Sequence, residues 1–347
     1  MKYPRFLSPL GAVGFAAPSF GCNIEPYQSR LKNALRRFQE WGPPVLLGPN
    51  CFLGKGVGIS NTPELCGKEL ADVYCSRENE AVIACGGGEL MNETIDCVDF
   101  TRIAEAPPKW YCGYSDNTNF TFLLATLFDT ASVYGAHGPS FGMEPLHPSL
   151  TDLYHFLTGQ KTEFTNYKAF EKIDEGLVTE ENPYAPINEK NPFDPVFYDA
   201  AGHVTDSVRL SGRLLGGCMD VLNNLRGTKY DRVGAFLDRY QEDGILWFLE
   251  SCELNPMAVR RSLWAMKQSG WFRHVKGFLI GRPMLLDRVD FGLSQQEAAV
   301  SVLSEFGVPI AYGIDLGHLA PSMPIVCGAI ADAEGEGKTF RIQYELR

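Results

Sequence analysis

The chain has 347 residues, of which 45% are hydrophobic and 21% are charged, and its formal net charge is −11. This length exceeds what one hydrophobic core usually fills, so we expect two domains. The acidic balance, without clustered lysine and arginine, argues against a nucleic-acid-binding protein.

The first half of the chain alternates short apolar strands with amphipathic helices, which is typical of a mostly parallel sheet covered on both faces. In the first helix Leu31, Leu35 and Phe38 recur at helical spacing, whereas Arg30 falls outside this apolar stripe. The predicted elements are strands at 12–17, 44–47, 81–85, 109–112 and 132–134, and helices at 27–41, 63–76, 119–128 and 148–157. The sequence therefore predicts an α/β fold.

The composition changes after the last of these helices. From 159 to about 207 the chain is rich in Asn, Pro, Glu and Lys and shows little periodicity. So long an irregular segment usually connects domains or covers a site, and we expect both. The sequence thus predicts an N-terminal α/β domain over 1–160, a linker and active-site loop over 161–206, and a C-terminal α/β domain over 207–347.

The second half returns to alternating elements. We predict strands at 208–215, 245–249, 277–280 and 309–312, and helices at 219–225, 232–240, 256–269 and 294–306. Two last strands, at 326–331 and 339–346, are expected to form a hairpin around the Glu-Gly-Glu-Gly sequence at 334–337.

Ser115 lies in the sequence Gly-Tyr-Ser-Asp at 113–116, between a predicted strand and a predicted helix. Such a turn lifts the serine hydroxyl clear of the backbone, and the first amides of the following helix stay free to bind negative charge. We therefore predict a nucleophilic serine. The competing interpretation is a serine that only caps the helix.

A nucleophilic serine needs a base and an acid that orients the base. Among six histidines, His318 is the one that follows the end of a predicted parallel strand, where open α/β sheets place functional groups. Another apolar strand ends in Glu250, whose buried carboxylate needs a partner such as imidazole. Glu253 is a competing acid, and Glu250 could instead pair with a nearby arginine. We predict a triad of Ser115, Glu250 and His318.

An oxyanion intermediate needs two N–H donors. The amide of Asp116 follows the nucleophile directly. The Cys-Gly-Gly-Gly sequence at 85–88 follows a strand that should end at the same sheet edge, and glycines permit a backbone turned toward a ligand. We choose Gly87 as the second donor, with Gly86 as the close alternative and a substrate contact.

Taken together, these blocks resemble the LD-carboxypeptidases, a family of serine peptidases that includes the microcin C immunity protein. The matching blocks are Gly86-Gly87 after a strand, Gly-Tyr-Ser-Asp at 113–116, Gly-Arg-Leu-Leu-Gly-Gly at 212–217, Leu-Arg-Gly-Thr at 225–228, Phe-Leu-Glu at 248–250 and Gly317-His318. The resemblance implies a Ser-Glu-His triad between two domains. It also implies a cytoplasmic homodimer that uses neither a metal nor a cofactor.

The chain departs from typical murein-recycling members near both glycine pairs. It has Cys85 where they have Arg before the first pair, and Gly88-Glu89 where they have Tyr-Gly after it. It also has Cys218 after the second pair, where many members have Asn. The first departure favours the microcin-immunity-like branch.

We expect the enzyme to hydrolyse an amide through an acyl-enzyme. One candidate is the L,D-amide bond between meso-diaminopimelate and D-Ala in muropeptide tetrapeptides, and the other is the amide of a peptidyl- or aminoacyl-nucleotide. A nucleotide reader needs an aromatic plane for the base, with Tyr167, Phe170 and Tyr184 as candidates. A carboxypeptidase needs a cation for the terminal carboxylate, with Arg213 as one option. A non-catalytic binding protein on the same fold is disfavoured because all three triad positions are filled.

The ten cysteines are scattered between Cys22 and Cys327, without a CxxC pair or a repeated spacing. Cys85 and Cys112 stand in apolar runs, where free thiols behave as small buried hydrophobes. We therefore expect reduced cysteines and a cytoplasmic protein. The apolar N-terminal stretch is broken by prolines and glycines, so we interpret it as a core strand rather than a signal peptide. No run approaches the ~18 apolar residues of a membrane span.

Overall fold

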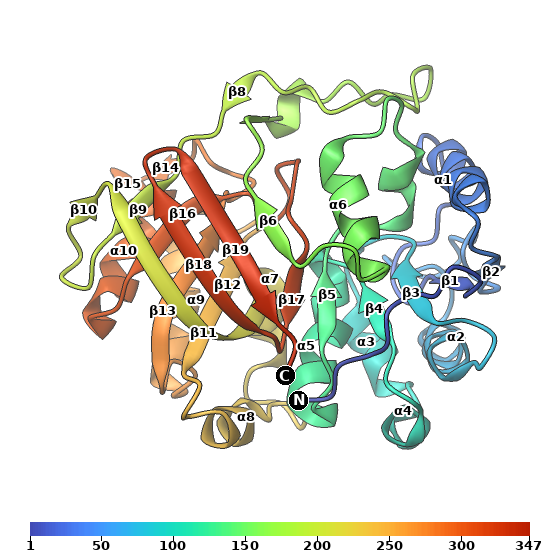
Figure 1. Cartoon of the computed structure of the whole chain (residues 1–347), viewed down its shortest axis with the longest axis horizontal. Helices are drawn as coiled ribbons and strands as arrows, with labels where there is room; N and C mark the ends of the chain where they lie inside the picture. Colours follow the sequence, from blue (N-terminus) through green and yellow to red (C-terminus); the bar gives the residue numbers. More distant parts are fainter.

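The computed structural model describes residues 1–347 and contains two large sheets, each packed against helices (Figure 1). The N-terminal sheet has the strand order β17-β5-β4-β3-β1-β2. Five of its strands are parallel, and β17 runs antiparallel to β5. The strands are β1 (Val13–Ala16), β2 (Val45–Leu47), β3 (Ala81–Ala84), β4 (Trp110–Cys112), β5 (Ser132–Tyr134) and β17 (Ile325–Cys327).

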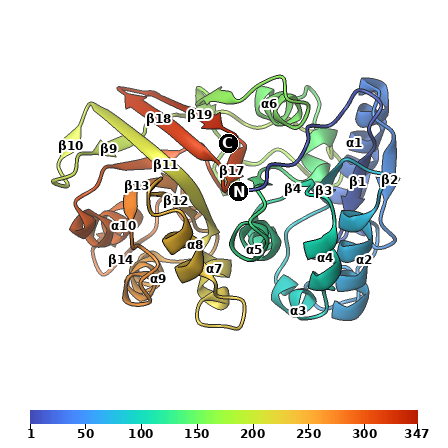
Figure 2. The ribbon, with the colours of Figure 1, turned by 60° about the horizontal axis from the view of Figure 1, so that its bottom comes forward.

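Helices cover both faces of this sheet, so β1, β3, β4 and β5 are buried along their whole length. The helices are α1 (Tyr27–Trp41), α2 (Pro63–Cys75), α3 (Met91–Asp96), α4 (Phe100–Glu105), α5 (Thr118–Phe128) and α6 (Pro148–Leu157). The short helices α3 and α4 are absent from the predicted elements. Helix α5 lies between the two sheets and also packs against the C-terminal domain (Figure 2).

The C-terminal sheet has nine strands in the order β10-β9-β16-β13-β12-β11-β18-β19-β6. Its centre is parallel and its two sides are antiparallel, so the expectation of a parallel sheet holds only for β11, β12, β13 and β16. These strands are β11 (Ser207–Cys218), β12 (Ile245–Glu250), β13 (Val275–Gly281) and β16 (Ile310–Ile314). The helices packed with them are α7 (Met219–Leu225), α8 (Val233–Arg239), α9 (Pro256–Gln268) and α10 (Gln295–Leu303). A small hairpin joins β14 (Val289–Asp290) to β15 (Leu293–Ser294).

The segment predicted to be irregular carries five short strands, and it crosses over the top of the molecule between the two sheets (Figure 1). They are β6 (Glu163–Thr165), β7 (Ala169–Phe170), β8 (Asn191–Pro192), β9 (Val196–Tyr198) and β10 (Val204–Thr205). Strands β6, β9 and β10 join the nine-stranded sheet, and β7 pairs with β8. Local periodicity misses them because each has only two or three residues, and β6 also pairs with a strand far away in sequence, as Phe164 opposite Ile342 illustrates.

The prediction of one strand at 326–331 is wrong, because parts of two separate strands occupy this region. Strand β17 ends at Cys327 and belongs to the N-terminal sheet, and β18 (Ile330–Glu336) begins after a break. Strand β18 pairs with β19 (Thr339–Glu345), so the predicted hairpin exists but turns later, at Gly337 and Lys338. Most of the Glu-Gly-Glu-Gly sequence therefore lies inside a strand.

Buried apolar side chains from both sheets form one continuous cluster of 87 residues. All ten cysteines are free thiols, and seven of them are buried. None of the helices combines the length and the hydropathy that a membrane span requires.

Candidate active site

Ser115 occupies the turn between β4 and α5, in a left-handed backbone conformation with a φ of 59°. A residue with a side chain rarely adopts a positive φ, and strain of this kind concentrates at functional turns. The Ser115 amide donates a hydrogen bond to the Tyr134 hydroxyl oxygen at 3.1 Å, which helps hold the turn. The strand-turn-helix context expected for a nucleophile elbow is present.

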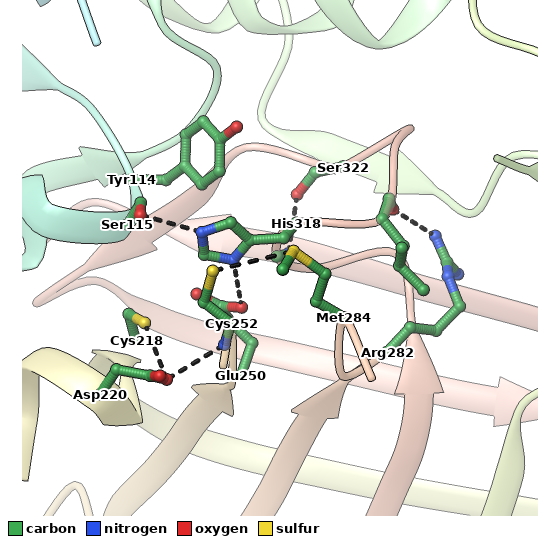
Figure 3. A network of polar contacts seen from close by, with 12 residues as sticks. Tyr114, Ser115, Cys218, Asp220, Glu250, Cys252, Arg282, Met284, His318 and Ser322 are labelled. Atoms are coloured by element: carbon green, nitrogen blue, oxygen red, sulfur yellow. Dashed lines mark hydrogen bonds and ion pairs between the residues drawn. The ribbon is translucent and has the colours of Figure 1, made fainter. Parts of the chain in front are cut away.

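Ser115, His318 and Glu250 come together in one hydrogen-bonded chain (Figure 3). The His318 Nε2 atom lies 2.9 Å from the Ser115 hydroxyl, and its Nδ1 atom lies 2.8 Å from a Glu250 carboxylate oxygen. Glu250 ends β12 and His318 follows β16, and these two parallel strands, with β13 between them, deliver both residues to the same edge of the C-terminal sheet. Glu253, the competing acid, is exposed. The arrangement can take a proton from the serine while the carboxylate orients the imidazole.

The pKa values of the acid and the base move in opposite directions. Burial on its own would raise the pKa of Glu250, but the charge and hydrogen bond of His318 and the Tyr134 hydroxyl outweigh it and lower that pKa. Burial likewise opposes a charge on His318, yet the Glu250 carboxylate raises the pKa of His318 well above its usual value. The pair therefore favours an ionised carboxylate beside an imidazole that accepts a proton readily.

Two glycines allow the close approach of these groups. A Cβ atom at Gly317, whose φ is 105°, would lie 2.6 Å from a Glu250 carboxylate oxygen. A Cβ atom at Gly87 would lie 3.1 Å from the Ser115 hydroxyl. Neither side chain could be added without moving the acid or the nucleophile.

The glycine loop places free N–H groups beside the nucleophile. Gly86 and Gly87 both line the pocket that contains Ser115, and the Gly87 amide donates to no carbonyl or side chain. The Asp116 amide likewise donates to no loop carbonyl or side chain. Both amides are thus free to donate to an oxyanion.

The Asp116 side chain has a structural role. It is buried and accepts hydrogen bonds from the Ser19 hydroxyl at 2.5 Å and the Met91 amide at 2.9 Å. Asn119 donates to its other oxygen at 3.0 Å. These bonds tie the elbow to two neighbouring loops. Burial outweighs them and raises the pKa of this carboxyl.

His137 lines the pocket, although its sequence context gives it no acidic partner. Its ring stacks on Tyr114 at 4.2 Å between centroids, and its Nε2 atom contacts the Tyr114 backbone and the Asn117 amide group. Burial lowers the pKa of His137 to about 3. The ring is therefore neutral near pH 7, and its contacts with Tyr114 and Asn117 help hold the turn around Ser115 in place. No signal in the local sequence marks this role.

Tyr134 is a further group that the sequence does not single out. Its hydroxyl donates to Glu250 at 2.5 Å and accepts from the Ser115 amide, so it connects the acid to the nucleophile across the two domains. Strand β5 carries Tyr134 and strand β12 carries Glu250, which are 116 residues apart in sequence. Only the fold reveals this contact.

Replacement of Tyr134 by Phe is expected to lower the free energy of unfolding by about 1–3 kcal/mol, because the buried Glu250 carboxylate loses a donor. Urea denaturation monitored by tryptophan fluorescence measures the change. The matched control is Tyr154→Phe, since the Tyr154 hydroxyl donates to no group in the structure, and its stability should stay within a few tenths of a kcal/mol of wild type. Equal losses in both variants would contradict a specific role for Tyr134.

The pocket in front of Ser115 has a volume of about 470 Å³. Its chemistry is mixed: aromatic rings, a cation, a carboxylate and the glycine loop all contribute. Besides Ser115, His318 and the glycines, the residues that line it are Phe20, Tyr27, Arg30, Cys85, Tyr114, His137, Pro139, Ser140, Glu171 and Val178. Glu171 and Val178 come from the crossing segment, so part of that segment covers the site, as predicted from its composition.

The aromatic residues proposed from the sequence as a base platform do not line this pocket. Tyr167 is hydrogen-bonded to Asp152, and Phe170 is buried beneath Arg282. Tyr184 is 40% exposed. The aromatic wall of the pocket comes instead from Phe20 and Tyr27, whose rings meet edge to face at 5.3 Å.

Arg213 is also placed elsewhere. Its guanidinium pairs with Asp243 at 2.6 Å, donates to the Gly328 carbonyl at 2.6 Å and lies over the Tyr240 ring at 4.0 Å. These contacts use its donors for internal packing, and Arg213 does not line the pocket. The cation beside Ser115 is Arg30.

Cys218 and Asp220 support the chain that follows Glu250. The Asp220 carboxylate accepts from the Cys252 and Glu253 amides at 3.0 and 2.9 Å, and it lies 3.4 Å from the Cys218 sulfur (Figure 3). Burial raises the pKa of the Cys218 thiol well above its usual value, so this thiol is not a nucleophile near neutral pH.

Two family models match the chain. Residues 13–135 match the LD-carboxypeptidase N-terminal domain, and residues 211–332 match the LD-carboxypeptidase C-terminal domain. Among curated relatives, a Bacillus subtilis protein named "Probable murein peptide carboxypeptidase" is 25% identical over 346 residues, which cover 98% of this chain and 94% of the relative.

Solved structures share the fold along the whole chain. An MccF-like protein from Bacillus anthracis has a TM-score of 0.78 at 22% identity and covers 99% of this chain and 100% of its own. The microcin C7 self-immunity protein MccF, in a complex with aspartyl sulfamoyl adenosine, has a TM-score of 0.78 at 19% identity, with 99% of each chain covered.

Proposed function

The chain belongs to the LD-carboxypeptidase family of serine peptidases, and from this premise we propose that it releases the terminal D-Ala from muropeptide tetrapeptides. The observation that carries the proposal is the hydrogen-bonded chain from Ser115 through His318 to Glu250 at the edge of a pocket. The name of the Bacillus subtilis relative supports the murein substrate.

The proposed mechanism is acyl transfer. His318 takes the proton of Ser115 as the hydroxyl oxygen attacks the amide carbonyl, and Glu250 holds the imidazole in position. The Gly87 and Asp116 amides stabilise the oxyanion. The imidazolium then returns the proton to the leaving amine, and water activated by the same imidazole releases the acyl group from Ser115.

A second candidate is the hydrolysis of peptidyl- or aminoacyl-nucleotides. The similarity to MccF, which is solved with aspartyl sulfamoyl adenosine, supports this candidate. The edge-to-face pair of Phe20 and Tyr27 in the pocket also favours it, because aromatic rings stack on nucleobases.

One experiment separates the two candidates. The protein is incubated with a disaccharide-tetrapeptide and, separately, with an aminoacyl sulfamoyl adenosine, and the products are identified by mass. Release of D-Ala from the first compound alone supports the murein peptidase. Cleavage of the second compound alone supports the nucleotide hydrolase, and cleavage of neither contradicts both.

The pH dependence of kcat/KM tests His318 as the base. Only a neutral imidazole accepts the serine proton, and Glu250 raises the pKa of His318 above its ordinary value of 6.5. The value of kcat/KM should therefore fall at low pH, where His318 is protonated, and rise through a midpoint above 6.5. Neutral His137 adds no second step there, because burial lowers its pKa to about 3. Activity that stays constant or declines as the pH rises from about 5 to about 8 would contradict the assignment.

We propose further that the enzyme works in the cytoplasm as a homodimer. Ten free cysteines, most of them buried, support a reducing compartment, and the dimer follows from the family resemblance. Light scattering coupled to size exclusion measures the oligomeric state.

A non-catalytic binding protein would be indicated if a fluorophosphonate failed to label Ser115 in the folded protein.

A further inference from the structure

Arg30 is a nearly buried cation that faces the pocket of Ser115 without a charged partner. It lies in α1, is 7% exposed, and lines the same pocket as Ser115 and His318. Its Nε atom donates to the Pro139 carbonyl at 3.2 Å, which fixes the side chain, while its two terminal nitrogens donate to no group. Neither terminal nitrogen is sealed from solvent, so both remain free to donate to a ligand.

Such a guanidinium is costly to bury without an anion. Arginine does not become neutral in proteins, so it cannot avoid the cost by losing its proton. Burial lowers the pKa of Arg30, and the nearby Glu171 charge opposes this only in part. No carboxylate lies within 4 Å of the guanidinium, and Glu171 instead accepts a hydrogen bond from the Asn188 amide at 2.6 Å. The protein thus keeps the two terminal nitrogens of Arg30 unpaired at the pocket that contains the nucleophile.

We propose that Arg30 binds the free carboxylate of the substrate's leaving group, and so makes this pocket selective for a C-terminal carboxylate. This inference rests on the proposed peptidase function and adds a binding residue to it. The planar fork of terminal N–H groups matches the two oxygens of a carboxylate. Arg30 supplies this cation to the pocket from α1.

The charge of Glu171 should affect carboxylate binding in the opposite direction to the charge of Arg30. Glu171 lines the same pocket and its charge acts on Arg30. An anion beside Arg30 is attracted by the guanidinium and repelled by Glu171. Loss of the arginine charge should therefore weaken the binding of a carboxylate, and loss of the glutamate charge should strengthen it.

The test uses two ligands that differ in one group: the disaccharide-tetrapeptide with a free D-Ala carboxylate and the same compound with a C-terminal amide. The wild-type enzyme should prefer the carboxylate by ~10–100-fold in kcat/KM, the usual range for a charge-assisted bidentate contact. Arg30→Gln should lose about that factor on the carboxylate, mainly through KM, and change by less than ~3-fold on the amide. The kcat/KM of Arg30→Lys on the carboxylate should lie between those of the wild type and Arg30→Gln. Glu171→Gln should lower KM for the carboxylate.

Arg36→Gln is the matched control. Arg36 lies on the same helix, is exposed, and pairs with Glu40 and Glu144 outside the pocket. This variant should retain the full preference for the carboxylate. Thermal unfolding of every variant checks that it folds.

Binding to the inactive Ser115→Ala protein separates this inference from the proposed function. Isothermal titration with the same two ligands gives affinities without turnover. If the protein prefers the carboxylate ligand through Arg30 but the wild type does not hydrolyse it, the peptidase function is contradicted and the carboxylate site is supported. Hydrolysis with an unchanged preference in Arg30→Gln would overturn the site and keep the peptidase. The carboxylate site would also be overturned if Arg30→Gln weakened the binding of both ligands equally, or if neither ligand bound.

Discussion

Replacement of Ser115 by Ala is expected to reduce kcat by roughly 10⁵-fold or more, because no other group can form the acyl-enzyme. The His318 base stays in place but has no hydroxyl at 2.9 Å to deprotonate. The fold should be unaffected, since the side chain is removed at a turn whose backbone bonds to Tyr134 remain. Release of D-Ala measured by mass gives the rate, and circular dichroism confirms the fold.

Ser211→Ala is the control for this loss. Ser211 is exposed on β11 and its hydroxyl makes no hydrogen bond in the structure, so the variant should match wild type. An alanine at 115 that leaves the rate undiminished would show that the triad assignment is wrong. A residual rate of ~10³ over the uncatalysed reaction is compatible with it, because the amides of the oxyanion hole still act on the substrate.

Glu250→Gln is the change with the second-largest expected effect, a loss of about 10⁴-fold in kcat. The glutamine keeps the shape of the buried site but removes the charge that stabilises the imidazolium and fixes its tautomer. The pKa of His318 should fall as well, because the Glu250 charge is what raises it against burial. The low-pH limb of the kcat/KM profile should therefore move to lower pH in this variant.

Glu253→Gln is the matched control, and it also tests the competing acid of the sequence. Glu253 is three residues further along and exposed. This variant should show a wild-type kcat and an unchanged pH profile. If Glu253→Gln lost the activity and Glu250→Gln kept it, the acid would have been assigned to the wrong residue.

The meeting of Ser115, Glu250 and His318 was predictable because each residue stands at or just after the end of a buried strand. Ser115, Glu250 and His318 follow apolar strands whose carboxyl ends meet at sheet edges, and the structure brings all three together. The roles of Tyr134 and His137 were not predictable. Their partners are set by packing between elements that are distant in sequence, which local patterns do not encode.

Arg30 shows a related limit of helical periodicity. The apolar stripe of α1 places Arg30 outside it, which would make it a solvated side chain. In the structure the short helix at Gly138–Gly142 packs on α1 and covers this side, so Arg30 is buried and donates to Pro139. Periodicity shows which face of a helix is apolar. Whether the polar face is exposed to solvent depends on the elements that pack against it.

The course of the chain after His318 ties the two lobes together. The chain passes back to the N-terminal sheet as β17, beside β5, and only then re-enters the C-terminal sheet as β18. A molecule divided near residue 160 would leave β5 as an open edge in the first fragment and would leave β17 in the second fragment without its partner strand. Any rotation of one lobe against the other would have to break the backbone hydrogen bonds between β17 and β5. The crossing segment that carries Glu171 also lines the pocket, but it is not part of this shared sheet.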